Sequence, residues 1–146
     1  MRALVTVYEC RGCFLLHPSG LRLRGPWVAQ EPGLGVSTSA TDEVLGQLVL
    51  LASQCSSPLP IGTPVDQGHR FPLQSLAGLK SWAGLARAAG MSLSVEFDGE
   101  IVKIRRSLQE GGAFSGDSAF VPIQVSSAVT PRELGHHVRR SLLGEA

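Results

Sequence analysis

The sequence predicts an α+β fold in a single domain, residues 1–146, with a mainly antiparallel sheet of about five or six strands and about three packed helices. The chain of 146 residues is the size of one ordinary domain, and its 43% hydrophobic residues are sufficient for a core. Two β-hairpin patterns, at residues 4–16 and 91–105, predict the sheet. Two capped helix starts, at Thr41 and Thr130, predict helices that follow short strands.

The first half begins with a hairpin. Its β-prone runs cover residues 4–8 and 14–16, and Arg11-Gly12 is the expected two-residue turn. Glycine and proline interrupt residues 20–40, so only short strands are expected there, at 27–30 and 34–36. Thr41 then caps a helix whose apolar residues cover most of its circumference, which predicts deep burial on all sides.

The second half begins with a helix and a second hairpin. A helix is expected over residues 73–89, ended by Gly90. Polar and apolar residues alternate from Met91 to Phe97, and Asp98-Gly99 is a strong hairpin-turn signature. The expected register places Val95 opposite Val102, Leu93 opposite Ile104 and Ser94 opposite Lys103.

The end of the chain predicts one more loop, strand and helix. Residues 107–118 are expected to form a glycine-rich loop, and residues 119–125 a strand that Pro122 limits to an edge or bulge. Thr130, Pro131 and Glu133 form a complete helix start with a capping box. The helix is expected to run to about residue 143, with Leu134, Val138 and Leu142 in one stripe.

Two segments resemble each other at a fixed spacing. Val36-Ser37, Thr41 and Leu45-Gly46 match Val125-Ser126, Thr130 and Leu134-Gly135. The match is either a coincidence between two capped helices or a repeated strand–helix unit whose glycine allows close packing. Two copies are too few for a solenoid, so the consequence is confined to the architecture of one domain.

Composition excludes several classes of protein. The net charge is +1, so no overall field recruits nucleic acid or an anionic membrane, and neither is an expected partner. Charged residues are 17% of the chain and apolar residues abundant, which excludes a disordered chain. No apolar run approaches the length of a membrane span, and Glu9 and Arg11 interrupt any signal-peptide core. We expect a cytoplasmic protein.

Cysteine and histidine supply the candidate metal chemistry. Cys10-x-x-Cys13 with His17 and Cys55 could form a zinc site, or the two close cysteines could form a disulfide or redox pair across the hairpin. A single such pair is a weak signal, and incidental thiols are the favoured interpretation, without metal or cofactor. Ser115 in the glycine-rich loop lacks the spacing of a nucleophile elbow, and the adjacent His136 and His137 point in different directions on a helix. We therefore expect no enzymatic activity.

Five carboxylates are the candidate protein-binding residues. They lie in the second hairpin and the loop after it: Glu96, Asp98, Glu100, Glu110 and Asp117. Such a patch complements a basic partner and steers its association. Ordinary solvated acids are the alternative interpretation.

The ordered motifs resemble the CdiI immunity proteins of contact-dependent growth inhibition systems. The motifs are Ala40-Thr-Asp-Glu-x-Leu-Gly46, Leu79-Lys-Ser-Trp82, the hairpin from Ser92 to Ile104, and Thr130-Pro-Arg-Glu-Leu-Gly135. The resemblance implies a cytoplasmic immunity protein that binds the C-terminal toxin domain of an effector and blocks its active site. The toxins of such systems are often nucleases, so the implied partner is a nuclease domain.

Overall fold

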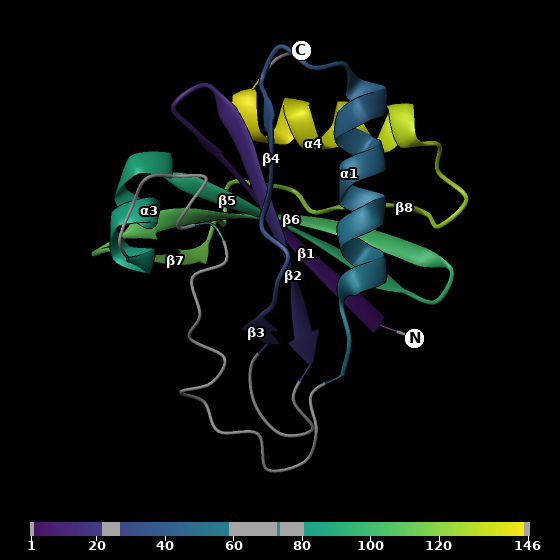
Figure 1. Ribbon diagram of the computed structural model, residues 1–146, viewed down its shortest axis with the longest axis horizontal. Helices are drawn as coiled ribbons and strands as arrows, with labels where there is room; N and C mark the ends of the chain where they lie inside the picture. Colours follow the sequence, from purple (N-terminus) through teal and green to yellow (C-terminus); the bar gives the residue numbers. More distant parts are fainter. Residues whose placement is uncertain (1, 22–26, 59–72, 74–80, 145–146) are drawn as a thin grey trace.

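The computed structural model describes residues 2–21, 27–58, 73 and 81–144 (Figure 1). The strands are β1 (Arg2–Cys10), β2 (Cys13–Leu21), β3 (Trp27–Ala29), β4 (Leu34–Ser37), β5 (Met91–Asp98), β6 (Ile101–Glu110), β7 (Ala113–Gly116) and β8 (Ile123–Ser126). The helices among these residues are α1 (Asp42–Cys55), α3 (Trp82–Ala89) and α4 (Pro131–Leu143).

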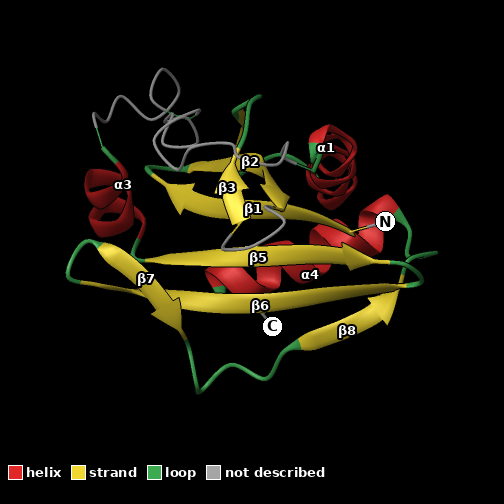
Figure 2. Cartoon of the chain, turned by 90° about the horizontal axis from the view of Figure 1, so that it is seen from below, coloured by secondary structure: helices red, strands yellow, loops and turns green. Residues whose placement is uncertain are grey.

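One antiparallel sheet organises the chain. Six strands follow the order β3-β2-β1-β5-β6-β7, while β4 pairs with β2 and β8 pairs with β6. Helices α1 and α4 pack on one face, and α3 lies on the other, toward one end (Figures 1 and 2). The expected α+β class with a mainly antiparallel sheet is confirmed.

The first hairpin forms as predicted. Cys10 lies opposite Cys13, and Arg11 and Gly12 form the turn with φ angles of 54° and 80°. The short strands β3 and β4 and the capping roles of Thr41 and Thr130 are also confirmed, since each threonine hydroxyl accepts the backbone N–H three residues later.

The predicted register of the second hairpin is wrong by two residues. Val95 lies opposite Ile104, and Ser94 lies opposite Arg105. The turn consists of Gly99 and Glu100, because Gly99 adopts the positive φ of 62° at the first turn position. A shift of two residues preserves which face each side chain occupies.

The expected glycine-rich loop is instead a third hairpin. Strand β6 continues to Glu110, and Gly111 and Gly112 form its turn with φ angles of 61° and 83°. The positive φ at both positions is the geometry of a tight hairpin turn. Strand β8 begins at Ile123, after Pro122, so the expected strand from residue 119 is shorter than predicted.

The structure confirms the repeated unit and extends it to the strands. Thr6 of β1 lies opposite Ser94 of β5, and the pairs Val5–Val95 and Val7–Leu93 are arranged symmetrically around them. Strand β4 pairs with β2 as β8 pairs with β6. The order β1-β2-β3-β4-α1 therefore recurs as β5-β6-β7-β8-α4 about a pseudo-two-fold axis between Thr6 and Ser94.

The core lies between the sheet and the two repeated helices. Its fully buried residues include Val5, Val7, Phe14 and Leu16 from the first unit and Leu93, Val95, Val102 and Ile104 from the second. From the helices it takes Leu45, Val49, Leu134 and Val138. The predicted stripe of the last helix is confirmed.

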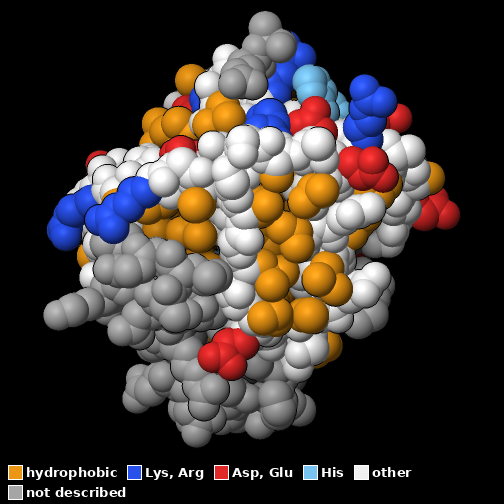
Figure 3. All heavy atoms as spheres, turned by 45° about the horizontal axis from the view of Figure 1, so that its top comes forward, with side chains coloured by type: hydrophobic (Ala, Val, Ile, Leu, Met, Phe, Trp, Pro, Cys, Tyr) orange, Lys and Arg blue, Asp and Glu red, His pale blue; other side chains and the backbone are white. Residues whose placement is uncertain are grey.

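The prediction that the first helix is buried on all sides is wrong. Val44 is 40% exposed and Leu51 is 49% exposed, because only one side of α1 contacts the sheet and α4. Hydrophobic side chains gather on the face of the molecule that carries α1 (Figure 3).

The remaining predictions concern the connection between the units. Of the expected helix over 73–89, the structure describes α3 and residue 73, and residues 74–80 lie outside the described part. Across the described segments, none of the helices has the length and apolarity needed to cross a membrane.

Candidate functional site

The sheet face opposite α1 and α4 has two halves. The half formed by β1 and β2 carries Tyr8, Leu15 and His17, which are at most 4% exposed because α3 and Leu73 cover them. We call this the covered half. In the half formed by β5 and β6, α3 contacts only the end near the turn between β6 and β7. The rest of this half carries Glu96, Lys103 and Arg105, and we call that part the open half. Figure 2 shows β5 and β6 with α4 behind them and no helix in front.

The polar side chains of the covered half bond to each other and to the backbone. The Tyr8 hydroxyl and His17 Nε2 are 3.0 Å apart, and His17 Nδ1 lies 2.9 Å from the Pro18 carbonyl oxygen. Trp82 of α3 meets the His17 ring edge-on, with 5.4 Å between the ring centroids. Burial raises the pKa of Tyr8 and lowers the pKa of His17 to about 4, so His17 is neutral at physiological pH. Both ring nitrogens are occupied, which indicates a structural role.

The open half forms one wall of a cavity of about 470 Å³. Its lining comprises Leu4, Ser94, Glu96, Lys103, Arg105, Arg106, Ser107, Gly116, Asp117, Ser118, Phe120 and Pro122. The cavity therefore joins the face of β5 and β6 to the segment between β7 and β8. Its surface combines hydroxyls, charges and one aromatic ring, a mixture suited to polar recognition.

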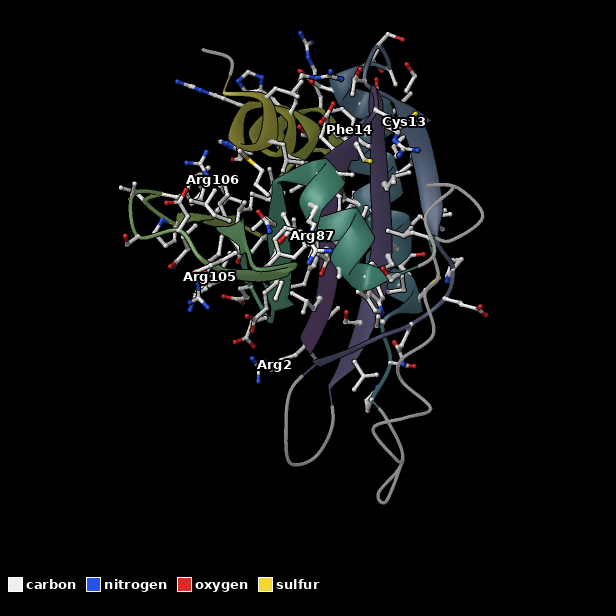
Figure 4. The ribbon with its side chains drawn as sticks, turned by 90° about the vertical axis from the view of Figure 1, so that its left-hand side faces the viewer. Arg2, Cys13, Phe14, Arg87, Arg105 and Arg106 are labelled. Carbon is white, nitrogen blue, oxygen red and sulfur yellow. The ribbon has the colours of Figure 1, made fainter. Side chains whose placement is uncertain are left out.

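Arg106 and Asp117 hold the segment after β7, which forms the wall of this cavity away from the face of β5 and β6. Arg106 Nη2 and Asp117 Oδ2 are 2.8 Å apart, and Arg106 Nη1 donates to the Ser141 carbonyl oxygen of α4 at 3.1 Å. The Arg106 guanidinium also lies 4.7 Å from the centroid of the Phe120 ring. In Figure 4 the neighbouring arginines of β6 point in opposite directions, with Arg106 toward α4. The segment after β7 is thus anchored to the strand and the helix.

The charges of the open half do not balance internally. Glu96 accepts from Arg2, with 2.6 Å between Glu96 Oε2 and Arg2 Nη2, and Asp117 is paired with Arg106. Within the described segments, Lys103 and Arg105 have no ion-pair partner. Two cations are consequently available to a ligand on this face.

The five carboxylates expected to bind a partner do not form one surface. Asp98 and Glu100 lie exposed at the turn between β5 and β6, and Glu96 lies on the face of β5, paired with Arg2. Glu110 lies at the other end of β6, where it accepts from the Ser115 hydroxyl at 3.1 Å. The side chain of Asp117 is 6% exposed. The carboxylates at the two ends of β6 are far apart because its ten residues span about 30 Å.

Of the four residues of the alternative zinc or redox module, only Cys10 and Cys13 lie opposite each other. Cys10 and Cys13 are free thiols across the first turn, and Cys55 is exposed at the end of α1. His17 already has a partner at each nitrogen. Among the residues described, no three histidine, cysteine, aspartate or glutamate side chains are arranged to hold a metal ion.

The other residues considered for catalysis have structural neighbours. Ser115 donates to Glu110, and His136 Nδ1 lies 3.5 Å from Asp42 Oδ2 at the contact between α4 and α1. The sequence interpretation did not place Lys103 and Arg105 together on a protein-binding surface. Their alternation with Val102 and Ile104 placed them on the polar face, but only the structure reveals that α3 leaves the open half uncovered.

Sequence comparison gives no relative: no family model and no curated protein matches the chain. Solved structures do match. A protein of unknown function from Neisseria meningitidis has a TM-score of 0.79 and 17% identity, over 100% of this chain and 96% of that one. A chain of the CdiA-CT/CdiI toxin and immunity complex from Yersinia pseudotuberculosis has a TM-score of 0.70 and 14% identity, over 99% and 97% of the two chains. At these identities the likeness establishes the fold, which this chain shares from end to end with a component of a toxin and immunity complex.

Proposed function

We propose that this chain is an immunity protein that binds and neutralises the C-terminal toxin domain of a contact-dependent growth inhibition effector. The observation that carries the proposal is the match, over nearly the full length of both chains, to a component of the CdiA-CT/CdiI complex. The resemblance of the ordered motifs to the CdiI proteins agrees with this match, although no family model matches the chain. Among the described residues, no helix covers Lys103 and Arg105 on the face of β5 and β6, which offers a surface for a protein partner.

The proposed mechanism is occupancy, without catalysis. A bound immunity protein excludes substrate from the toxin, so none of its own residues needs a shifted pKa or an activated nucleophile. We propose that the toxin is a nuclease and that the complex forms in the cytoplasm of the cell that makes both proteins. Tight binding follows from a well-packed contact with a few central anchors.

The test uses the toxin domain encoded by the gene immediately upstream. Its expression alone should stop growth, and co-expression of this chain should restore growth and yield a complex by size-exclusion chromatography. An unrelated toxin domain is the control and should remain lethal. If the upstream domain is lethal and this chain neither binds it nor restores growth, the proposal is wrong.

A further inference from the structure

We infer that the open half of the sheet face is the docking surface for the partner, and that the partner segment which covers it is acidic. The inference rests on the proposed function and specifies its contact surface. Two independent observations support it: the internal symmetry of the fold and the charges left unpaired on this face.

The symmetry identifies the open half as a surface whose equivalent is covered. Tyr8, Leu15 and His17 occupy the positions that Glu96, Lys103 and Arg105 occupy in the second unit, 88 residues later. In the first unit, the eight-residue helix α3 packs on these positions together with Leu73 and Phe114, and α3 reaches the second unit only at one end of β5, β6 and β7. In the second unit the described chain supplies no such cover, and a cavity of about 470 Å³ lies there. A single short segment of a partner therefore suffices to cover the open half as α3 covers the other.

The side chains specify the chemistry of that segment. The positions that are aromatic or apolar under α3 are charged in the open half. Glu96 is neutralised by Arg2 and Asp117 by Arg106, so Lys103 and Arg105 remain as the available charges. Ser94 and Ser107 flank Arg105 on the same face and add hydroxyl groups. Carboxylates match this set, since the arginine fork binds them in a bidentate manner.

Nucleic acid fits this surface less well than an acidic peptide segment. Glu96 and Asp117 line the same cavity and oppose a run of phosphates. Phe120 is the one aromatic ring of the lining, and Arg106 already lies over it. The described surface therefore lacks the free stacking platforms on which single-stranded nucleic acids bind.

The test neutralises the two cations and compares matched variants. Lys103→Gln with Arg105→Gln removes both charges without placing an acid opposite Glu96. Arg132→Glu reverses an exposed charge on α4, on the other side of the sheet, as a control. Glu100→Lys reverses an exposed carboxylate at the nearby turn. Thermal unfolding of each purified variant establishes that it is folded.

The first measurement uses the upstream toxin domain, inactivated by mutation, in calorimetric titration. Loss of Lys103 and Arg105 should weaken binding at least about tenfold, and should reduce the salt dependence of the affinity between about 50 and 500 mM NaCl. Arg132→Glu and Glu100→Lys should bind as tightly as the wild type. Wild-type affinity in the double variant, or a tenfold loss in Glu100→Lys alone, overturns the inference while leaving the proposed function intact.

The second measurement needs no toxin. Amide resonances of residues 94–96 and 103–107 should shift when a short glutamate peptide is added, and should not shift with a lysine peptide or in the double variant. A short single-stranded RNA should bind more weakly than the glutamate peptide. Absence of these shifts, or stronger binding of the RNA, contradicts an acidic protein segment as the occupant. This result is obtained even if the chain neutralises no toxin, so the two proposals fail separately.

Discussion

Gly46 of α1 and Gly135 of α4 lie against each other's helices at the point where the two helices cross. A side-chain carbon on Gly46 would collide with the Pro131 carbonyl group, and one on Gly135 would collide with the Asp42 carbonyl group. Asp42 and Pro131 are themselves equivalent positions in the two units, so the contact repeats the symmetry of the sheet. The crossing is therefore fixed by backbone-to-backbone contact, which only glycine permits at both positions.

Gly46→Ala and Gly135→Ala should each destabilise the protein by at least about 2 kcal/mol, because the obstacle is backbone that cannot rotate away. Gly84→Ala in α3 is the control, since its new carbon would meet only a side-chain atom, the Ser81 hydroxyl oxygen at 3.3 Å, and no backbone. Urea unfolding measures all three. Equal stability of Gly46→Ala and Gly84→Ala would contradict the close crossing.

Leu51→Arg and Val44→Glu should change the free energy of unfolding by less than about 0.5 kcal/mol. Both side chains face outward, and the equivalent positions of α4 already hold Arg140 and Glu133. Leu45→Ala, at a fully buried position one residue from Val44, should cost about 2–5 kcal/mol. Urea unfolding of the three variants distinguishes the two sides of α1, and similar losses at all three positions would contradict the exposed stripe.

Stability should fall as the pH is lowered from about 6.5 to about 4, because His17 is neutral in the fold and protonated in the unfolded chain. Between these values the unfolded state binds one more proton than the native state, so the free energy of unfolding rises with pH. The full effect is about 3 kcal/mol. Urea unfolding at several pH values measures this slope.

His17→Gln should remove the His17 contribution to the change of unfolding free energy with pH, even if it lowers stability at every pH. His137→Gln, on the partly exposed surface of α4, should retain it. If the free energy of unfolding of His17→Gln depends on pH as in the wild type, other groups cause the loss of stability at low pH.

The three thiols should react with a disulfide reagent in the order of their exposure. Cys55 is exposed and should react first, whereas Cys10 is buried and its burial raises the thiol pKa, which lowers the thiolate fraction. Cys55→Ser should abolish the fast phase. Rapid modification of Cys10 in the native protein would indicate that α3 does not stay on the covered half.

Local signals in the sequence were sufficient for most of the fold. Arg11-Gly12 and the caps Thr41 and Thr130 are short-range patterns, and each is confirmed. The repeat of Leu45-Gly46 at Leu134-Gly135 indicated close packing by glycine, and the structure shows that the close contact is between the two helices. The register of the second hairpin was wrong because Gly99 can serve at either turn position.

The candidate site depends on long-range packing, which local patterns do not encode. Nothing near Lys103 or Arg105 in the sequence indicates that α3 packs on Tyr8, Leu15 and His17 and not on these two residues. The dispersal of Glu96 and Glu110 follows from the length of β6, which was expected to end about five residues earlier. The exposure of Val44 and Leu51 likewise follows from how many neighbours surround α1, a property of the assembled fold.

The placement of α3 constrains the outer face of the first unit more than that of the second. The first unit, whose outer face is filled from within the chain, is constrained by packing at Tyr8, Leu15 and His17, where most substitutions would disturb folding. The second unit has the same architecture, but within the described part of the chain no helix packs on Lys103 and Arg105 of its outer face. If the open half is the docking surface, substitutions at positions 103 and 105 should therefore change the binding preference while the scaffold that displays them stays unchanged.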